Sequence, residues 1–294
     1  MKSLVVVMLF FSSAAFALTE TEQTLTPRAQ QFELRAGAAY EFMDASYETG
    51  GSATSNGFII PATAFYGLND NNAIGFGINY LSQTIDEKPN LQPSYKSKTK
   101  GFENFNLQYK GNFDIIRKMT LFLGAEFDIP PEKFSINRLT YDYTASKGQM
   151  SLSGTVGLLM PVSMFKLGTL LSYKYAMDGD GTLTDVGYTN AAIKTSGGSG
   201  FAIQFFGEIE NAYNPNVSIG YSSYDKISLK ANGVSVGNFI KRDILALRGS
   251  LRFIATENLD IIPYASYENV LNKSDVDADK WNIFTLGADA RFLF

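Results

Sequence analysis

The chain has 294 residues, 45% of them hydrophobic, with 25 Lys and Arg against 29 Asp and Glu, and it contains neither Cys nor His. These absences exclude a disulfide framework, a thiolate nucleophile, a Ser-His-Asp triad and thiolate or imidazole metal ligands, and with them most common enzyme designs. The small negative charge argues against a nucleic-acid surface, which needs clustered basic residues.

The first twenty residues have the pattern of an export signal. Lys2 precedes an apolar run, Leu4–Phe11, and a small-residue stretch that ends in Ala15–Ala17. This order of charge, apolar core and A-x-A is typical of a secretory signal peptide. A membrane-spanning helix is the alternative, but it needs about 20 apolar residues, more than the run from Ser3 to Leu18 provides. We therefore expect residues 1–17 to be a signal peptide.

A polar tail of residues 18–30 precedes a segment that alternates. In Phe32–Phe42 the even positions are apolar and most odd positions are polar, charged or small. A strand sends these two sets to opposite faces, whereas a helix would mix them. Eleven further segments alternate in the same way: Gly57–Leu68, Ala73–Gln83, Phe105–Phe113, Met119–Asp128, Gln149–Leu158, Phe165–Tyr175, Phe201–Glu210, Val217–Tyr224, Asp243–Ile254, Leu259–Glu268 and Asn282–Phe294.

The eleventh segment, Leu259–Glu268, is the least regular. Ile262 and Tyr264 interrupt its polar face, and Pro263 removes a hydrogen-bond donor from the strand. With this segment included, the alternation predicts twelve strands.

The connections between these segments also alternate. Five are short and rich in turn formers, such as Asn69–Asn72. We predict that the other six are mostly longer, polar loops: Glu48–Asn56, Thr84–Gly101, Ile129–Gly148, Ala176–Gly200, Asp225–Arg242 and Asn269–Lys280. Consecutive antiparallel strands place every second connection at the same rim. One rim should therefore carry tight turns and both termini, and the other rim the loops.

This asymmetry and an even strand number are typical of a transmembrane β-barrel. The alternative is a secreted, soluble β-sandwich, which also keeps one face apolar. Long strands, an apolar register without charges in its central part and aromatic residues near its ends favour the membrane. We predict an all-β fold, an antiparallel up-and-down barrel of about 12 strands over residues 31–294, with both termini and the tail of residues 18–30 in the periplasm.

The last strand carries a resemblance. Phe284–Phe294 places apolar residues at every even position and ends the chain on Phe. It resembles the C-terminal assembly signal of Gram-negative outer-membrane β-barrels, although no particular porin family is recognisable. The resemblance implies a location in the bacterial outer membrane, with its lipid and its barrel-assembly machinery as partners.

If the apolar register faces lipid, the other register lines the interior. The candidate pore-lining residues are Glu33, Arg35, Glu41, Lys110, Glu126, Asp128, Lys166, Lys174, Glu208, Glu210, Arg248, Arg252, Asp289 and Arg291, and the same register holds Asp260 and Glu268. Unpaired charges in a dry interior are costly, so the lumen should be hydrated, internally paired, or both. Basic side chains gathered on a few strands could set an electric field across a pore. Ion pairs that brace the wall explain them equally well.

The second and third strands have no charge within the segments predicted here. Their inward register holds Ile59, Pro61, Phe65 and Leu81. Ordinary packing explains this, and an inserted loop or the tail could also lie against it.

Two loop segments require interpretation. Asp178–Asp185 resembles a calcium loop in its alternate carboxylates, but Leu183 stands where the loop needs Gly and Thr189 where it needs Glu. We interpret it as a solvated Asp-Gly turn. Ile227–Val236 has Asn-Gly between alternating arms, which predicts a hairpin that extends two strands beyond the membrane.

These features predict a porin-like channel for passive diffusion of ions or small polar solutes. A non-conducting structural or adhesive barrel, whose loops bind an outside partner, is the alternative. Twelve strands lie between filled barrels of about 8 strands and open porins of 16 to 18. We expect no catalytic residue, cofactor or metal; the oligomeric state is left open.

Overall fold

The computed structural model describes residues 24–47, 50–90, 93–116, 118–146, 148–185, 188–231, 233–239, 241–271 and 278–294. The expected signal peptide and residues 18–23 of the tail lie outside the described residues. Within the described part, no helix is long and apolar enough to span a membrane.

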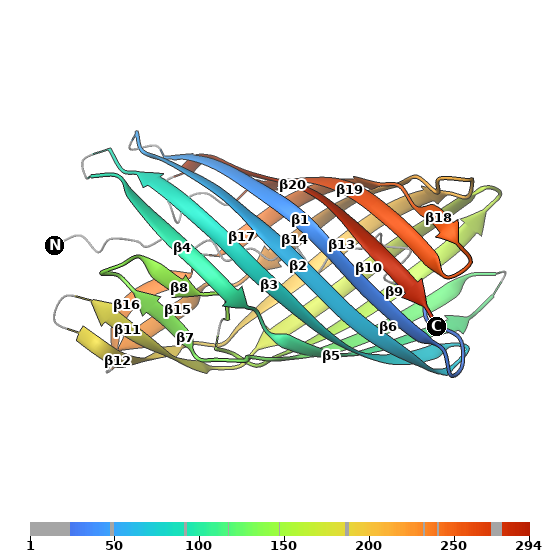
Figure 1. The fold of residues 1–294 in the computed structure, drawn as a ribbon, viewed down its shortest axis with the longest axis horizontal. Helices are drawn as coiled ribbons and strands as arrows, with labels where there is room; N and C mark the ends of the chain where they lie inside the picture. Colours follow the sequence, from blue (N-terminus) through green and yellow to red (C-terminus); the bar gives the residue numbers. More distant parts are fainter. Residues whose placement is uncertain are drawn as a thin grey trace.

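Twelve long strands close an antiparallel barrel (Figure 1). They are β1 (Phe32–Tyr47), β2 (Ser52–Asn69), β3 (Asn72–Lys88), β5 (Phe105–Asp114), β6 (Thr120–Ile129), β9 (Ser151–Val162), β10 (Phe165–Ala176), β13 (Gly198–Ile209), β14 (Asn216–Tyr224), β17 (Arg242–Ser250), β19 (Leu259–Val270) and β20 (Ala278–Leu293). Each pairs with the next, and β1 pairs with β20 to close the wall. The predicted all-β antiparallel barrel and its strand number are confirmed, including the irregular eleventh strand, which is β19.

The first and last strands meet at one end of the barrel. Phe32 N donates to the Phe294 carbonyl over 3.2 Å, and Phe294 N donates back to the Phe32 carbonyl over 2.8 Å. This end, called the turn rim below, carries the short turns, such as the one between β2 and β3. The opposite end is called the loop rim.

The prediction of six mostly long loops is wrong for much of the loop rim. The connections contain further strands: β4 (Tyr95–Phe102), β7 (Phe134–Asn137), β8 (Asp142–Thr144), β11 (Gly179–Asp185), β12 (Tyr188–Thr195), β15 (Ile227–Ala231) and β16 (Val234–Phe239). The β15–β16 hairpin was predicted and is confirmed. A last short strand, β18 (Phe253–Thr256), pairs with β19 near the turn rim.

The β7–β8 hairpin is inserted into the wall. β8 pairs in parallel with β4, and β7 pairs in parallel with β11, so the hairpin joins two segments that are far apart in the sequence. β12 then pairs with β15. These pairings extend the barrel wall beyond its twelve-stranded part. Their partners are distant in the chain, which is why local turn signals indicated loops.

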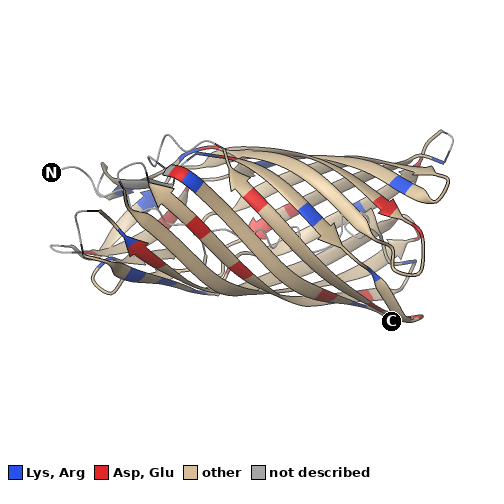
Figure 2. Cartoon of the chain, turned by 90° about the horizontal axis from the view of Figure 1, so that it is seen from above, with Lys and Arg blue, Asp and Glu red and all other residues tan. Residues whose placement is uncertain are grey.

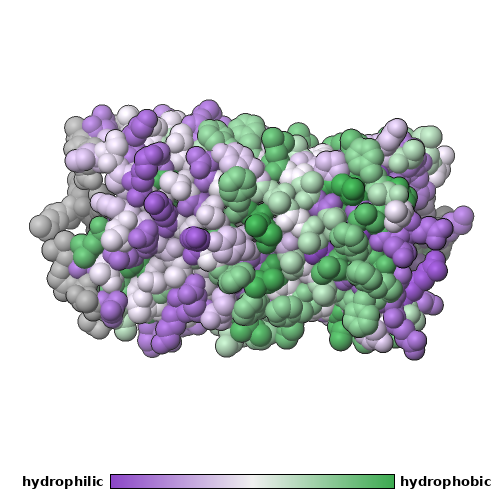
Figure 3. Space-filling model, in the orientation of Figure 1, coloured by the Kyte–Doolittle hydropathy of each residue, from purple (hydrophilic) through white to green (hydrophobic). Residues whose placement is uncertain are grey.

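The outer surface changes character along the barrel. On the β1 exterior, Tyr40 and Phe42 are 42% and 40% exposed, and the next two outward residues are Asp44 and Ser46. On the face drawn in Figure 3, apolar side chains gather toward the turn rim and polar side chains toward the loop rim. We call these parts the turn half and the loop half. Exposed apolar side chains on this scale belong in lipid.

Aromatic pairs mark both edges of the belt. Phe32 and Tyr66 pack at 4.8 Å between ring centroids near the turn rim, and Tyr40 and Phe58 at 5.1 Å near the junction of the halves. Eight residues separate these levels along each strand, close to the roughly 9 to 11 tilted residues with which a β-strand spans a bilayer. Aromatic girdles of this kind sit at the two membrane interfaces.

The interior changes in the opposite sense. In the turn half the inward side chains are mostly polar, small or charged. In the loop half they are largely apolar: Met43, Ala45, Ala53, Ile85, Ile244, Val270, Trp281 and Ile283 form one buried cluster. Phe134, Ile136, Tyr143, Leu183, Ile193, Leu229 and Ala231 form another on the added hairpins. The loop half therefore has the apolar interior and polar exterior of a water-soluble barrel.

Candidate functional site: the barrel lumen

The structure places the candidate pore-lining residues on the inward register, with two exceptions. Glu210 lies past the end of β13 at the turn rim, and Arg252 lies in the link between β17 and β18. Figure 2 shows acidic and basic residues interspersed along the barrel. The two signs do not occupy separate sides of the wall.

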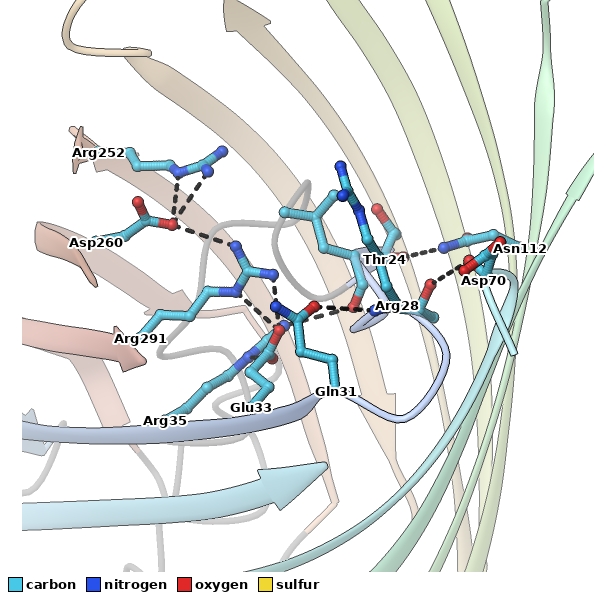
Figure 4. A network of polar contacts seen from close by, with 12 residues as sticks. Thr24, Arg28, Gln31, Glu33, Arg35, Asp70, Asn112, Arg252, Asp260 and Arg291 are labelled. Atoms are coloured by element: carbon cyan, nitrogen blue, oxygen red, sulfur yellow. Dashed lines mark hydrogen bonds and ion pairs between the residues drawn. The ribbon is translucent and has the colours of Figure 1, made fainter. Parts of the chain in front are cut away.

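Near the turn rim, a series of ion pairs links neighbouring strands on the inner side of the wall (Figure 4). Glu33 accepts from Arg35 and, over 2.7 Å, from Arg291. Asp260 accepts from Arg291 over 3.2 Å and from Arg252 over 3.0 Å. These pairs join β1, β20, β19 and the link between β17 and β18. They favour the wall-bracing interpretation for these residues.

The tail crosses the mouth of the barrel at the same rim. Asn112 Nδ2 donates to the Thr24 carbonyl over 2.6 Å, and Arg35 Nη2 donates to the Leu25 carbonyl over 3.4 Å. Both donors belong to inward-facing side chains, so the tail is held from inside the lumen (Figure 4). It narrows the opening at the turn rim.

Gly67 makes this position of the tail possible. Gln30 N donates to the Gly67 carbonyl over 2.8 Å. A Cβ at position 67 would lie 1.9 Å from the Arg28 carbonyl oxygen. Only glycine therefore lets the tail backbone approach β2 this closely.

Another segment also enters the lumen. Ala145, which follows β8, packs with Ile59 and Leu81 in a cluster completed by Ala39 and Tyr264. The uncharged inward register of β2 and β3 thus receives an inserted segment, one of the alternatives that the sequence left open.

Further ion pairs lie on the opposite wall. Lys174 of β10 reaches across β9 to Asp128 of β6, which also accepts from Ser151. Lys166 pairs with Glu210 over 2.7 Å at the turn rim. Here too, an acid on one strand holds a base on another.

Lys110 and Arg35 share an aromatic partner. Lys110 Nζ lies 4.1 Å and Arg35 Cζ 5.3 Å from the Phe65 ring centroid. A cation over an aromatic face is stabilised by the ring quadrupole. Phe65 therefore helps to hold two cations inside the lumen.

A cavity of about 70 Å³ lies in the lumen close to the junction of the two halves. It offers room for about five water molecules. Among the side chains that line it are those of Arg248, Tyr264, Glu268, Ser218, Ser266 and Thr285. The sequence predicts Arg248 as a pore-lining residue, but no local pattern in it indicates that Tyr264 lies beside Arg248.

Arg248 is held in a stack. Its Cζ lies 4.2 Å from the Tyr264 ring centroid. The same ring lies close to Gly287, where a Cβ would come within 2.5 Å of the Tyr264 Cζ atom. Glycine on β20 thus lets the ring lie against the wall, and the ring orients the guanidinium.

The structure separates two arginines that the sequence grouped. Arg252 pairs with Asp260 in the turn-rim network, whereas Arg248 lines the cavity. The two therefore have different surroundings and should differ in their effect on solutes.

The calcium-like segment is an extended strand instead of a loop. Asp178 accepts from Gly197 N, and Asp185 pairs with Arg138 over 3.1 Å. Among the described residues, no three acidic side chains gather in a way that could hold a metal ion.

Two ionisable groups interact in the loop half. Tyr95 donates a hydrogen bond to Glu87, which faces the interior. Burial raises the pKa of Glu87, more than the Tyr95 hydrogen bond lowers it. Burial and the nearby Glu87 charge raise the pKa of Tyr95 as well.

Comparison with solved structures finds a barrel of the same fold. No protein-family model matches the sequence, and no curated protein matches it. An outer-membrane channel from Pseudomonas putida F1 is similar in structure, with a TM-score of 0.64 at 10% identity, over 92% of this chain and 98% of that chain. The TodX monoaromatic hydrocarbon channel, as a deletion mutant, gives 0.49 at 10% identity over 96% and 94%. A Pseudomonas aeruginosa FadL homologue gives 0.42 at 10% identity over 97% and 95%.

The closed barrel and its apolar belt define the class as a transmembrane β-barrel, and the Pseudomonas putida channel shares this fold.

Proposed function

We propose that the protein is a channel through which small polar solutes or ions diffuse passively across the outer membrane. The observation that carries this proposal is the interior of the turn half. Where lipid surrounds the barrel, the lumen is lined by charged and hydroxyl side chains and contains a cavity. Polar groups at that depth are tolerated where they face one another or water.

Similar architecture supports the proposal. The Pseudomonas putida protein with the same fold is an outer-membrane channel. The tail at the turn rim and the apolar interior of the loop half narrow the path, so the conductance should be small compared with that of open porins.

Conductance in planar lipid bilayers tests the proposal. Purified protein should produce discrete current steps in KCl, and boiled protein should produce none. Absence of channel events over a range of salt concentrations would refute it.

Selectivity tests which arginine acts on passing ions. Arg248→Gln should shift the reversal potential in a KCl gradient toward that of cations, because Arg248 lines the cavity. Arg252→Gln should shift it less, because Asp260 balances that charge locally. Equal shifts would mean that the cavity has no special influence on ion flow.

A barrel without conductance, which binds a partner through the loop rim, is the second candidate. The polar exterior of the loop half favours it, since the added hairpins present a large water-facing surface (Figure 3). A stable barrel that gives no current would support this candidate.

A further inference from the structure

The lumen cavity places two opposite charges in one small space. Arg248 and Glu268 both line it, and they are 6% and 9% exposed. Arg248 is paired in register with Ser266, and Glu268 with Ala246, so the two charges are diagonal neighbours on adjacent strands. Diagonal neighbours lie about 7 to 8 Å apart at the backbone.

Glu268 faces the cavity. Its carboxylate makes no hydrogen bond or ion pair with any described residue, although Arg242 and Arg248 lie within electrostatic range. A buried carboxylate in this situation favours a cationic or hydrogen-bonding partner from outside the chain.

Thr285 gives a second, independent indication of a ligand. Its Oγ1 atom is buried and has no hydrogen-bond partner in the described structure, and the side chain lines the same cavity. Buried hydroxyls are normally hydrogen-bonded. A polar solute in the cavity would provide the missing partner.

Arg248 has the geometry of an anion anchor. Stacking on Tyr264 fixes the plane of the guanidinium, and Gly287 keeps the Tyr264 ring against the wall. A guanidinium in a fixed plane presents paired N–H donors to a planar carboxylate. Less side-chain freedom is then lost when a solute binds.

We propose that this cavity is a recognition site for small zwitterions of the α-amino acid class. The carboxylate binds Arg248, the ammonium group lies toward Glu268, and Thr285 contributes a hydrogen bond. A zwitterion matches the one cation and one anion of the lining, and a volume of about five water molecules suits a small amino acid. The proposal rests on the proposed channel function, since it assigns a solute class to the same lumen.

Three probes of similar size test the ammonium and the carboxylate group of the solute separately. L-Alanine carries both groups, L-lactate has a hydroxyl in place of the ammonium, and L-alaninol has a hydroxymethyl in place of the carboxylate. Saturation-transfer NMR on the folded protein in detergent micelles measures the affinity of each. Alanine should bind at least about tenfold more tightly than either analogue.

Two variants assign the roles. Arg248→Gln should lower alanine affinity to that of alaninol, and Glu268→Gln should lower it to that of lactate. Arg138→Gln, on the added hairpins and far along the chain from the cavity strands, is the matched control and should bind alanine as the unchanged protein does. A difference in gel mobility between the unboiled and the boiled sample confirms that a variant is folded.

The possible results are distinct. Equal binding of the three probes, or alanine affinity that neither variant alters, would overturn the zwitterion site. Alanine binding with the expected variant effects but without bilayer conductance would refute the channel and leave the site intact. Conductance without a preference for alanine would support the channel and refute the zwitterion site.

Discussion

The turn half and the loop half use the same strands with opposite polarity. On β1, the outward residues Tyr40 and Phe42 face lipid, while Glu41 faces the interior; one step further, Met43 faces inward and Asp44 outward. On β20 the inward residue changes from Thr285 to Ile283, while Phe284 between them faces outward. Strand geometry is unchanged across the junction, so the surrounding medium must determine which face is apolar.

This difference shows where each half obtains its stability. In the turn half, apolar side chains remain exposed and lipid covers them. In the loop half, buried apolar clusters exclude water as in a soluble protein. Each large side chain that is fully buried there stabilises the fold by about 1.5 to 3 kcal/mol. Substitutions at equivalent registers should therefore have different consequences in the two halves.

The largest effect is expected inside the loop half. Ile283→Ala removes a side chain from the cluster around Met43 and Trp281, and should lower the free energy of unfolding by about 2 to 5 kcal/mol. Thr285→Ala, two residues along the same inward face, should change it by about 0.5 kcal/mol. Urea unfolding in lipid vesicles, followed by the fluorescence of the single Trp, measures both. Equal losses would mean that no apolar core exists in the loop half.

A charge on the exterior should have the next largest effect. Ala288→Arg places a charge in the middle of the β20 belt and should destabilise the barrel by about 2 to 4 kcal/mol. Thr54→Arg, which is exposed on β2 in the loop half, should be nearly neutral because water solvates it. Vesicle unfolding of the two variants checks this prediction, and a costly Thr54→Arg would place lipid further toward the loop rim.

The sequence predicted the turn half better than the loop half. In Phe32–Phe42 an alternating pattern and a long strand coincide, so the strand and its lipid-facing side followed directly. Gly179–Asp185 has the composition of a turn, yet it is β11, because β7 and β12 pair with it on either side. The partner β7 lies more than 40 residues earlier, and no local pattern indicates it.

The candidate site was predicted only as a list of inward charges. Alternation places Arg248 and Glu268 on the inward register, but the stack of Arg248, Tyr264 and Gly287 depends on the pairing of three strands. The same pairing brings Arg291 to Asp260 and makes that charge part of the wall. Register between distant strands decides which charges bind one another and which line a cavity.

Removal of the tail should widen the mouth of the barrel at the turn rim. Deletion of residues 24–30 removes the segment that Asn112 and Arg35 hold across the turn rim. We expect a higher single-channel conductance, because this mouth becomes wider. The same current in both proteins would place the narrowest part of the path elsewhere. A chain with Asn112→Ala, which loses one of these contacts, should show an intermediate increase.

The smallest effect concerns pH in the loop half. Because burial raises the pKa of Glu87, protonation of this carboxyl stabilises the fold. The stabilisation is fully present below the ordinary pKa of Glu and is lost as pH rises through the raised value. Glu87→Gln keeps a neutral side chain and should reduce the loss of stability between pH 4 and pH 8, as measured by urea unfolding. An unchanged pH dependence would assign the effect to other groups.

The reversal of polarity along each strand is the central claim, and cysteine labelling tests it directly. The chain has no Cys, so single cysteines on the outward face of β2 report without background. In lipid nanodiscs, a water-soluble maleimide should react at Ser52→Cys, Thr54→Cys and Asn56→Cys. It should not react at Phe58→Cys, Ile60→Cys or Ala62→Cys, which lie in the belt. Uniform labelling along β2 would contradict the division of the barrel into two halves.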